Sequence, residues 1–272
     1  MLYNEYTSAK AQSDYNTIIV GAGVGGLEVT RQLQHKNKMS PHDILLLEGT
    51  NEIGGIMKST QIDNETMHHS YIGVDTKSNA KDIFDDLNVK TITATITDKR
   101  PYVIGETEET VEYIIPQYTD LPNAIYRAFP SPQVLKTNKF VKYVERSSNQ
   151  WNVYIDDVNQ PLPYTCNNLI ICTQAEPAQH ILKRVIRYDW TKDLFNFYDD
   201  TRQYSIEPSN GNITDNLLLT DSDNAMFSFT ERIGIKGKQK LPHAKNLYYC
   251  STDLSGGLEQ TLLDAREIAY KL

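Results

Sequence analysis

The chain has 272 residues, and its 35 acidic against 27 basic residues give a formal net charge of −8. Such an acidic balance argues against nucleic acid as the main partner, because a phosphate backbone would be repelled. No apolar run approaches the length of a membrane span, so we expect no membrane-spanning segment. The length is enough for one or two domains around a substantial core.

Residues 1–11 are polar, unlike a signal peptide, and we expect an N-terminal arm there, either an extra strand or a loose segment. The cysteines are Cys166, Cys172 and Cys250, an odd number without a CxxC pair, which favours unbridged thiols in a reducing, cytoplasmic compartment. We predict no metal site, because His68 and His69 are adjacent rather than spaced as ligands on one helix face.

The first predicted element is a strand, a glycine turn and a helix over residues 17–28. Gly21 allows a tight turn out of the strand, Gly23 leaves room for a pyrophosphate, and Gly26 lets the helix pack closely on the sheet. Unpaired N–H groups at the start of the helix would face the phosphates, so the candidate cofactor-binding residues are Gly21, Ala22, Gly23, Val24, Gly25 and Gly26.

A second strand over residues 43–48 ends in Glu48, about 20 residues after the glycine turn, where a carboxylate can accept hydrogen bonds from ribose hydroxyls. The strand, turn, helix and acidic strand end agree with one another, which predicts a site for the ADP half of a dinucleotide. An ordinary strand–helix turn is the alternative, and it does not explain Glu48.

The residues after this strand are Gly49, a short loop, and then Gly54 and Gly55 followed by Ile56. This order resembles the FAD-binding start of the flavin-containing amine oxidase superfamily, and it implies non-covalent FAD as the cofactor. Paired glycines let the backbone run close to a cofactor. A plain turn would fit the Gly-Gly pair alone equally well.

Residues 67–74 resemble the family segment that enters the vicinity of the flavin. His69 and Tyr71 are therefore the candidate catalytic residues, with the histidine as a base near neutral pH. A surface histidine pair before a strand is the alternative. Helical spacing follows at residues 79–87, 121–129 and 180–198, and strand-like patterns at residues 91–96 and 226–235.

Residues 140–155 alternate apolar and polar side chains about a turn and predict a β-hairpin. The resemblance implies that a valine of this hairpin touches the adenine, either Val141 or, second, Val144. An ordinary hairpin core residue would show the same pattern.

Residues 167–173 predict a buried strand, which resembles the family strand that returns to the cofactor and ends at Thr173. Residues 245–260 resemble the closing motif of the family, a strand followed by a helix whose start faces the flavin. The matching positions in this closing motif are Gly256, Gly257, Leu258 and Glu259.

The resemblance implies an α/β fold: a Rossmann-like FAD-binding domain, with a central parallel sheet, helices and a β-hairpin, plus a small inserted α+β cap. We expect the FAD-binding domain at 12–75, 134–176 and 243–272. The cap is expected at 76–133 and 177–242. Local periodicity alone predicts only a mixed α/β chain.

Several positions depart from the family pattern. Ile56, Met57 and Lys58 follow the glycine pair where an arginine is common, and Ser251-Thr252 replaces a Gly-Glu pair. Leu254-Ser255 stands where many amine oxidases place an aromatic cage wall, which leaves amine specificity open.

The predicted function is an amine-oxidase-like, FAD-dependent oxidoreductase that transfers a hydride from a small-molecule substrate to flavin N5. The departures favour one alternative, a flavoprotein-derived protein with a binding or structural role and no catalysis. A minor alternative is a NAD-binding Rossmann protein.

Overall fold

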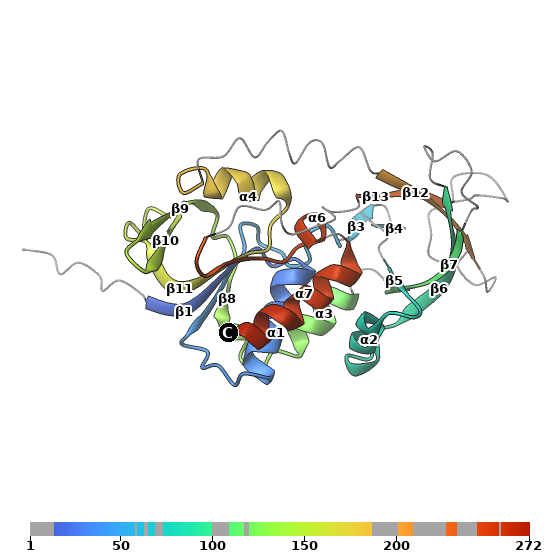
Figure 1. Ribbon diagram of the computed structural model, residues 1–272, viewed down its shortest axis with the longest axis horizontal. Coiled ribbons are helices and arrows are strands. Elements are labelled where there is room, and N and C mark those ends of the chain that lie inside the picture. The colour runs from blue at the N-terminus through green and yellow to red at the C-terminus, as the bar shows by residue number, and fades with distance from the viewer. Residues whose placement is uncertain are drawn as a thin grey trace, which may run out of the picture.

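The computed structural model describes residues 14–57, 59–62, 65–68, 73–99, 109–116, 120–186, 201–208, 227–232, 244–255 and 257–272. Within these ranges the chain builds a larger, mostly parallel sheet covered by helices and a smaller antiparallel sheet (Figure 1). The expected α/β class is confirmed.

The larger sheet has seven strands in the order β8-β2-β1-β11-β10-β9, with β14 also pairing with β11. Its parallel strands are β1 (Asp14–Val20), β2 (Ile44–Leu47), β8 (Leu135–Lys136), β11 (Tyr164–Ile171) and β14 (Leu247–Tyr249). Along one edge of β11 the partner changes, because Thr165 and Cys166 face β10 while Leu169 to Ile171 face β14. Because these strands are parallel, their carboxyl ends lie together at one end of the sheet. This is where α/β proteins bind their ligands.

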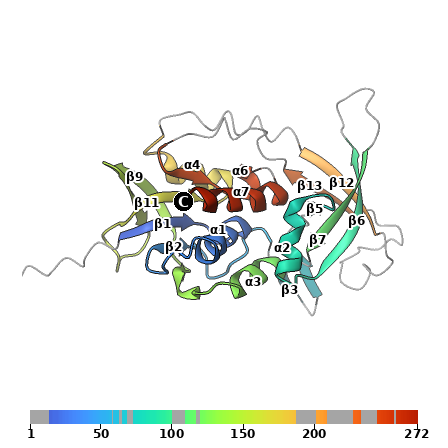
Figure 2. The same cartoon turned by 60° about the horizontal axis from the view of Figure 1, so that its bottom comes forward.

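One face of this sheet is covered by α1 (Val24–His35), α3 (Asp120–Arg127) and α7 (Leu258–Lys271), which lie side by side in both views (Figures 1 and 2). Alternate strand residues such as Ile19 and Leu46 point into this face, and they join Leu27 and Leu262 in one hydrophobic cluster. Two segments from opposite ends of the chain, α1 and α7, thus share one core.

On the opposite face, α4 (Ala175–Leu182) packs against the β-hairpin, which continues the same sheet beyond β11 and contributes its side chains to the core there. The hairpin consists of β9 (Val141–Ser147) and β10 (Gln150–Ile155), paired antiparallel as the alternation predicts. Ile18 and Leu45, the strand neighbours of the residues on the first face, pack there against Trp151 and Val144. Because β1 and β2 are buried on both faces, their apolar residues run without interruption instead of alternating with polar ones.

The smaller sheet is antiparallel throughout, in the order β13-β12-β6-β7-β5. Its strands are β5 (Val74–Asp75), β6 (Thr91–Lys99), β7 (Glu109–Pro116), β12 (Thr201–Pro208) and β13 (Phe227–Arg232). Both stretches expected to form the cap contribute strands, since β6 and β7 come from the first and β12 and β13 from the second.

Four short elements complete the described chain before the hairpin: the pair β3 (Ser59–Ile62) and β4 (Glu65–His68), the 3₁₀ turn η1 (Asn79–Lys81) and α2 (Asp82–Asp86). A second 3₁₀ turn, η2 (Pro132–Val134), precedes β8, and α6 (Thr252–Ser255) follows β14. The expected domain boundaries stay a prediction. Two helices lie wholly or mostly in the stretches expected to form the cap, yet they pack on the larger sheet. The helix α3 shares its core with α1, and α4 packs against β9.

The helix predicted at 180–198 is described only in its first part. There α4 spans Ala175–Leu182 and residues 183–185 form a turn, whereas residues 187–200 lie outside the described part, so the remainder of this helix stays a prediction. Pro177 lies in the first helical turn, where its missing N–H has no intrahelical acceptor to lose, so the helix can begin before it. In the part of the chain that the structure describes, no helix is long and apolar enough to cross a membrane.

Candidate dinucleotide-binding site

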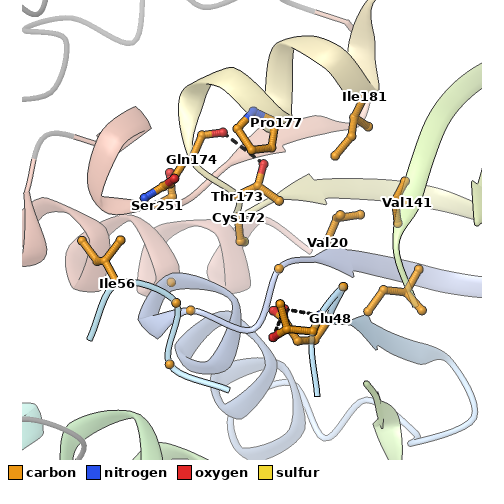
Figure 3. Close-up of a pocket in the computed structure, with 18 of the residues that line it drawn as sticks. Val20, Glu48, Ile56, Val141, Cys172, Thr173, Gln174, Pro177, Ile181 and Ser251 are labelled. Atoms are coloured by element: carbon orange, nitrogen blue, oxygen red, sulfur yellow. Dashed lines mark hydrogen bonds between the residues drawn. The ribbon is translucent and has the colours of Figure 1, made fainter. Parts of the chain in front are cut away.

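A cavity of about 690 Å³ opens at the carboxyl ends of β1, β2 and β11. Its walls come from the glycine turn after β1, the loop after β2, the start of the hairpin, α4 and the segment after β14. Figure 3 shows these walls around Val20 and Cys172, with α4 on one side and Glu48 on the other. Five segments that are distant in sequence thus converge on one hollow.

Two glycines of the turn are required by the packing of the protein itself. Gly21 has a φ of +104°, and a Cβ there would lie 2.8 Å from the carbonyl oxygen of Cys172. A Cβ on Gly26 would lie 1.9 Å from the carbonyl oxygen of Gly21. Gly26 therefore lets α1 leave the sheet closely, as the sequence predicted.

Gly25 is also crowded, since a Cβ there would lie 2.1 Å from the carbonyl oxygen of Cys250. This contact joins the glycine turn to the end of β14. The first turn of α1 therefore packs against the residues that follow two strands, Cys172 after β11 and Cys250 after β14.

Gly23 is different, because the protein does not need a glycine there. Its φ of −72° suits any residue, and the nearest atom to an added Cβ would be the Cα of Gly55 at 3.8 Å. Gly23 lines the cavity and is the N-cap of α1, whose first turn carries no acidic residue. A bare backbone at the positive end of a twelve-residue helix is what a pyrophosphate requires.

The Gly54-Gly55 loop lies directly against this turn. Gly54 N–H donates to the carbonyl of Ala22 at 2.8 Å, and Gly23 and Gly54 form a β-bridge. Gly54 and Gly55 both have positive φ, at +108° and +59°. The second glycine loop therefore extends the same narrow wall of the cavity, which continues to Ile56.

Glu48 lies half-buried at the end of β2 and lines the cavity. Its Oε2 accepts the N–H of Ala22 at 2.8 Å, and its Oε1 accepts both the N–H and the hydroxyl of Thr50 at 2.9 Å. Oε2 keeps a second lone pair for a further donor. The carboxylate is thus fixed beside the glycine turn, where the hydroxyls of a ribose would meet it.

The far wall is mostly apolar. Val141 is 4% exposed, and it lines the cavity together with Pro177 and Ile181 of α4 (Figure 3). Thr173 follows the end of β11 and also lines the cavity, and its hydroxyl donates to the carbonyl of Gln174. Apolar walls beside a carboxylate suit a ligand with one flat apolar part and one hydroxyl-bearing part.

The lysine that lines the cavity is already paired with another residue of the protein. Lys139 forms an ion pair with Asp157, which raises the pKa of the lysine and lowers that of the aspartate through their mutual hydrogen bond. The positive potential left for phosphates therefore comes mainly from backbone N–H groups at the start of α1. Among the described residues, no group of His, Cys, Asp and Glu is arranged to hold a metal ion.

The structure brings most of the predicted site residues together but not all of them. Those that line the cavity are Gly21, Gly23, Val24, Gly25, Glu48, Gly49, Gly54, Gly55, Ile56, Val141 and Thr173. Ala22 and Gly26 lie behind the turn, and Gly257, Leu258 and Glu259 lie outside the lining set. Leu258 is fully buried in the cluster under α1 and α7. His69, Tyr71, Lys58 and Gly256 fall outside the described residues, so their roles stay predictions.

Sequence reasoning missed several lining residues, namely Lys139, Phe140, Gln174, Pro177, Ile181, Ser251 and Thr252. Ser251 and Thr252 immediately follow β14, and Gln174 follows β11 closely. Their place just past parallel strand ends was the available signal, because such ends meet at one edge of the sheet.

Comparisons with known proteins bear on this geometry. The family model described as "NAD(P)-binding Rossmann-like domain" matches residues 19–87, which contain the glycine turn and Glu48. Among curated proteins, no sequence matches this chain.

Solved structures of putrescine oxidase, from a redesign of its cofactor binding, match nearly the whole chain. The wild type bound to putrescine has a TM-score of 0.62 at 8% identity, covering 95% of this chain and 98% of that one. A point mutant has a TM-score of 0.64 at 9% identity, covering 96% and 99%. The chain has the amine oxidase fold. The resemblance predicted from the two ends of the sequence is thus confirmed at the level of the fold. At this identity the amine oxidase fold fixes neither the substrate nor the reaction.

Proposed function

We propose that this chain binds FAD non-covalently and works as an FAD-dependent oxidoreductase of the amine-oxidase-like type on a small-molecule substrate. The observation that carries the proposal is Gly23, where backbone conformation and neighbouring atoms would allow a side chain but the cavity wall has none. A structural turn gives no reason for glycine at this position, whereas a bound pyrophosphate does.

The residues around the cavity divide the cofactor between them. The N–H groups at the start of α1 would bind the pyrophosphate, and Gly23 and Gly55 would let it approach the backbone. The carboxylate of Glu48 would accept a ribose hydroxyl with the lone pair that remains on Oε2. Ile56, Thr173 and Ser251, with Gly256 to Glu259, would lie toward the flavin half.

When bound, FAD supplies a hydride acceptor at its N5 atom, and the protein contributes orientation, water exclusion and proton handling. His69 and Tyr71 are the proposed substrate-side residues, and the imidazole of His69 suits removal of a proton near neutral pH. Reoxidation would use oxygen or another acceptor, since the sequence offers one convincing glycine turn and no second nucleotide site.

A second candidate is a protein that binds the dinucleotide in a regulatory or structural role without catalysis. The specific observation in its favour lies just after the glycine pair, where the resemblance implies a phosphate-binding arginine. Ile56, Met57 and Lys58 follow the pair here, and Ile56 and Met57 line the cavity. The family match to an NAD(P)-binding domain similarly makes NAD a candidate ligand.

The experiment is an absorption spectrum of the purified protein before and after addition of FAD, run on the wild type and on Gly23→Leu. Visible flavin bands that are released on denaturation are expected for the wild type. The variant should keep its melting temperature, because the added side chain enters the cavity, and should lose the flavin. Equal flavin content in the two proteins would remove Gly23 from the cofactor site, and a wild type that takes up no FAD would refute the proposal.

A further inference from the structure

Phe140 is a large apolar side chain that is 55% exposed, yet it lines the cavity. Other exposed apolar residues of the described chain, such as Val158 at 93% and Tyr270 at 91%, lie outside the lining set. The described lining residues include no other phenyl, phenol or indole ring. An aromatic face left open inside a binding cavity indicates a ligand with a flat surface of its own.

The backbone around Phe140 is fixed by hydrogen bonds on both sides. The N–H of Lys139 donates to the carbonyl of Glu48 at 2.8 Å, and the carbonyl of Phe140 accepts the N–H of Asp156 at 2.8 Å. The next residue, Val141, pairs with Ile155 in the hairpin. Phe140 is therefore tied directly to the strand end that carries the carboxylate.

Gly49 determines how close the ring can lie. A Cβ on Gly49 would be 3.3 Å from Cδ2 of Phe140 and 3.7 Å from its Cα, so the ring rests against the bare backbone that follows Glu48. A 3.3 Å approach would push the ring outward by a few tenths of an ångström. Gly49 thus has a packing role that the sequence did not reveal.

We propose that Phe140 is the platform on which the adenine of the dinucleotide stacks, and that Gly49 is a glycine so that this platform can lie beside Glu48. The inference rests on the proposed function and adds a base-recognition residue to it. A ribose held by Glu48 carries its base on the neighbouring carbon, which brings the base within reach of a ring packed against Gly49. Val141, Pro177 and Ile181 supply the apolar walls around it.

This placement also changes the interpretation of the hairpin. The family resemblance implied that Val141 or, second, Val144 touches the adenine. The Val141 side chain is 4% exposed and shares a cluster with Ile18 and Val20. Most of the surface that Val141 could offer is already used by the core. The preceding residue has the open face, and because every base has such a face, stacking on it tolerates any purine.

The test measures dissociation constants for ADP by calorimetry on the wild type, Phe140→Ala, Phe140→Tyr and Val158→Ala. Phe140→Ala should weaken ADP binding by about 5-fold to 150-fold, which is the range that loss of one base–aromatic stack typically costs. Phe140→Tyr keeps the ring and should stay within about twofold of the wild type. Val158→Ala removes an apolar side chain that is still more exposed, at 93%, and lies outside the cavity, so it should change nothing.

A structural role is separated from stacking by two further readouts. The first is the melting temperature, which should be equal in all four proteins because Phe140 and Val158 are both exposed. The second is Gly49→Ala, which should weaken ADP binding while Phe140 is present and have less effect in the Phe140→Ala background. Wild-type affinity in Phe140→Ala, with ADP and FAD still bound, would overturn this inference alone. A wild type that binds neither ADP nor FAD would overturn the proposed function and this inference together.

Discussion

At the scale of single residues, Glu48 joins the fold to the proposed ligand. Its carboxylate holds the N–H of Ala22, a fully buried residue of the glycine turn, and it also lines the cavity. Truncating it therefore has two consequences, because a backbone donor loses its acceptor and a ribose would lose a charged one.

Glu48→Ala should weaken FAD binding by about 1–3 kcal/mol and also lower the melting temperature. Glu48→Gln is the matched variant, since its amide oxygen can still accept one of these hydrogen bonds without the charge, so its stability should stay closer to the wild type. Titration of FAD by fluorescence quenching, together with thermal unfolding, measures both effects. Full affinity in the alanine variant would show that the ribose binds elsewhere.

Cys166 gives a prediction about alkaline stability. It is fully buried in β11, and burial raises the pKa of its thiol to about 12 from an ordinary 9.0. The folded state keeps the thiol protonated while the unfolded chain releases the proton near pH 9, so the contribution is complete below pH 9 and is lost as pH rises toward 12.

The loss attributable to Cys166 is at most about 4 kcal/mol across that window, from about 1.4 kcal/mol per pKa unit. Urea unfolding at a series of pH values on the wild type and Cys166→Ala measures it. The variant should be less stable at pH 7, because a buried sulfur is removed, but its stability should fall less steeply above pH 9. Parallel curves would mean that other groups, such as the tyrosines and lysines shared by both proteins, account for the alkaline loss.

At the scale of elements, α7 supports the cavity from behind. It packs on α1, and the hydroxyl of Thr261 in its first turn donates to the carbonyl of Gly257, while the thiol of Cys250 donates to the carbonyl of Thr261 at 3.3 Å. Since the carbonyl of Cys250 also abuts Gly25, α7, the end of β14 and the glycine turn form one packed unit.

Leu262→Ala tests this unit, because Leu262 is fully buried in the cluster shared with α1. Removing its side chain should cost about 2–5 kcal/mol of unfolding free energy, as other buried leucines do. Tyr270→Ala lies on the same helix but is 91% exposed, and it should stay within about 0.5 kcal/mol of the wild type. Similar losses from the two substitutions in urea unfolding would mean that α7 is not anchored through this cluster.

The elements also show which parts of the site the sequence could predict. The glycine turn and Glu48 were predictable because each obeys a local rule: a strand end, a φ that only glycine adopts, a helix start, and an acid at the next parallel strand end. The hairpin was predictable for the same reason, since its alternation and turn are local.

The remaining walls depend on tertiary contacts, which a strand end in the sequence indicates only when its neighbours in the sheet are known. Ser251 and Thr252 reach the cavity only because β14 pairs with the second half of β11, a partner change that no local pattern encodes. Leu258 is the converse case, because its side chain is buried in the core and leaves only its backbone for the role expected at the flavin. Likewise, the reason for glycine at position 49 is a contact with Phe140, far away in the sequence.

At the scale of the whole molecule, one chain forms two sheets, a larger one that is mostly parallel and a smaller one that is antiparallel. The larger sheet contains the strand ends around the cavity, while both stretches expected to form the cap contribute strands to the smaller sheet. If the protein is a flavoenzyme, the ligand must extend beyond the ADP half of the cavity, because the isoalloxazine ring needs a place of its own. A binding protein without catalysis requires the ADP half alone.

Melting temperatures with ADP, FAD and NAD at one equal free concentration separate these cases. A ligand that binds only the folded state stabilises it according to its affinity, by about 2.7 kcal/mol at a concentration 100 times its dissociation constant. A flavoenzyme should be stabilised more by FAD than by ADP, because the isoalloxazine ring adds contacts beyond those of the shared ADP half. Equal shifts would mean that the flavin end is not held and would favour a binding role, since the glycine turn and Glu48 would then explain all the affinity. A larger shift with NAD would favour the nicotinamide dinucleotide, and Gly23→Leu should remove the shift in each case because all three ligands share the phosphate that this glycine admits.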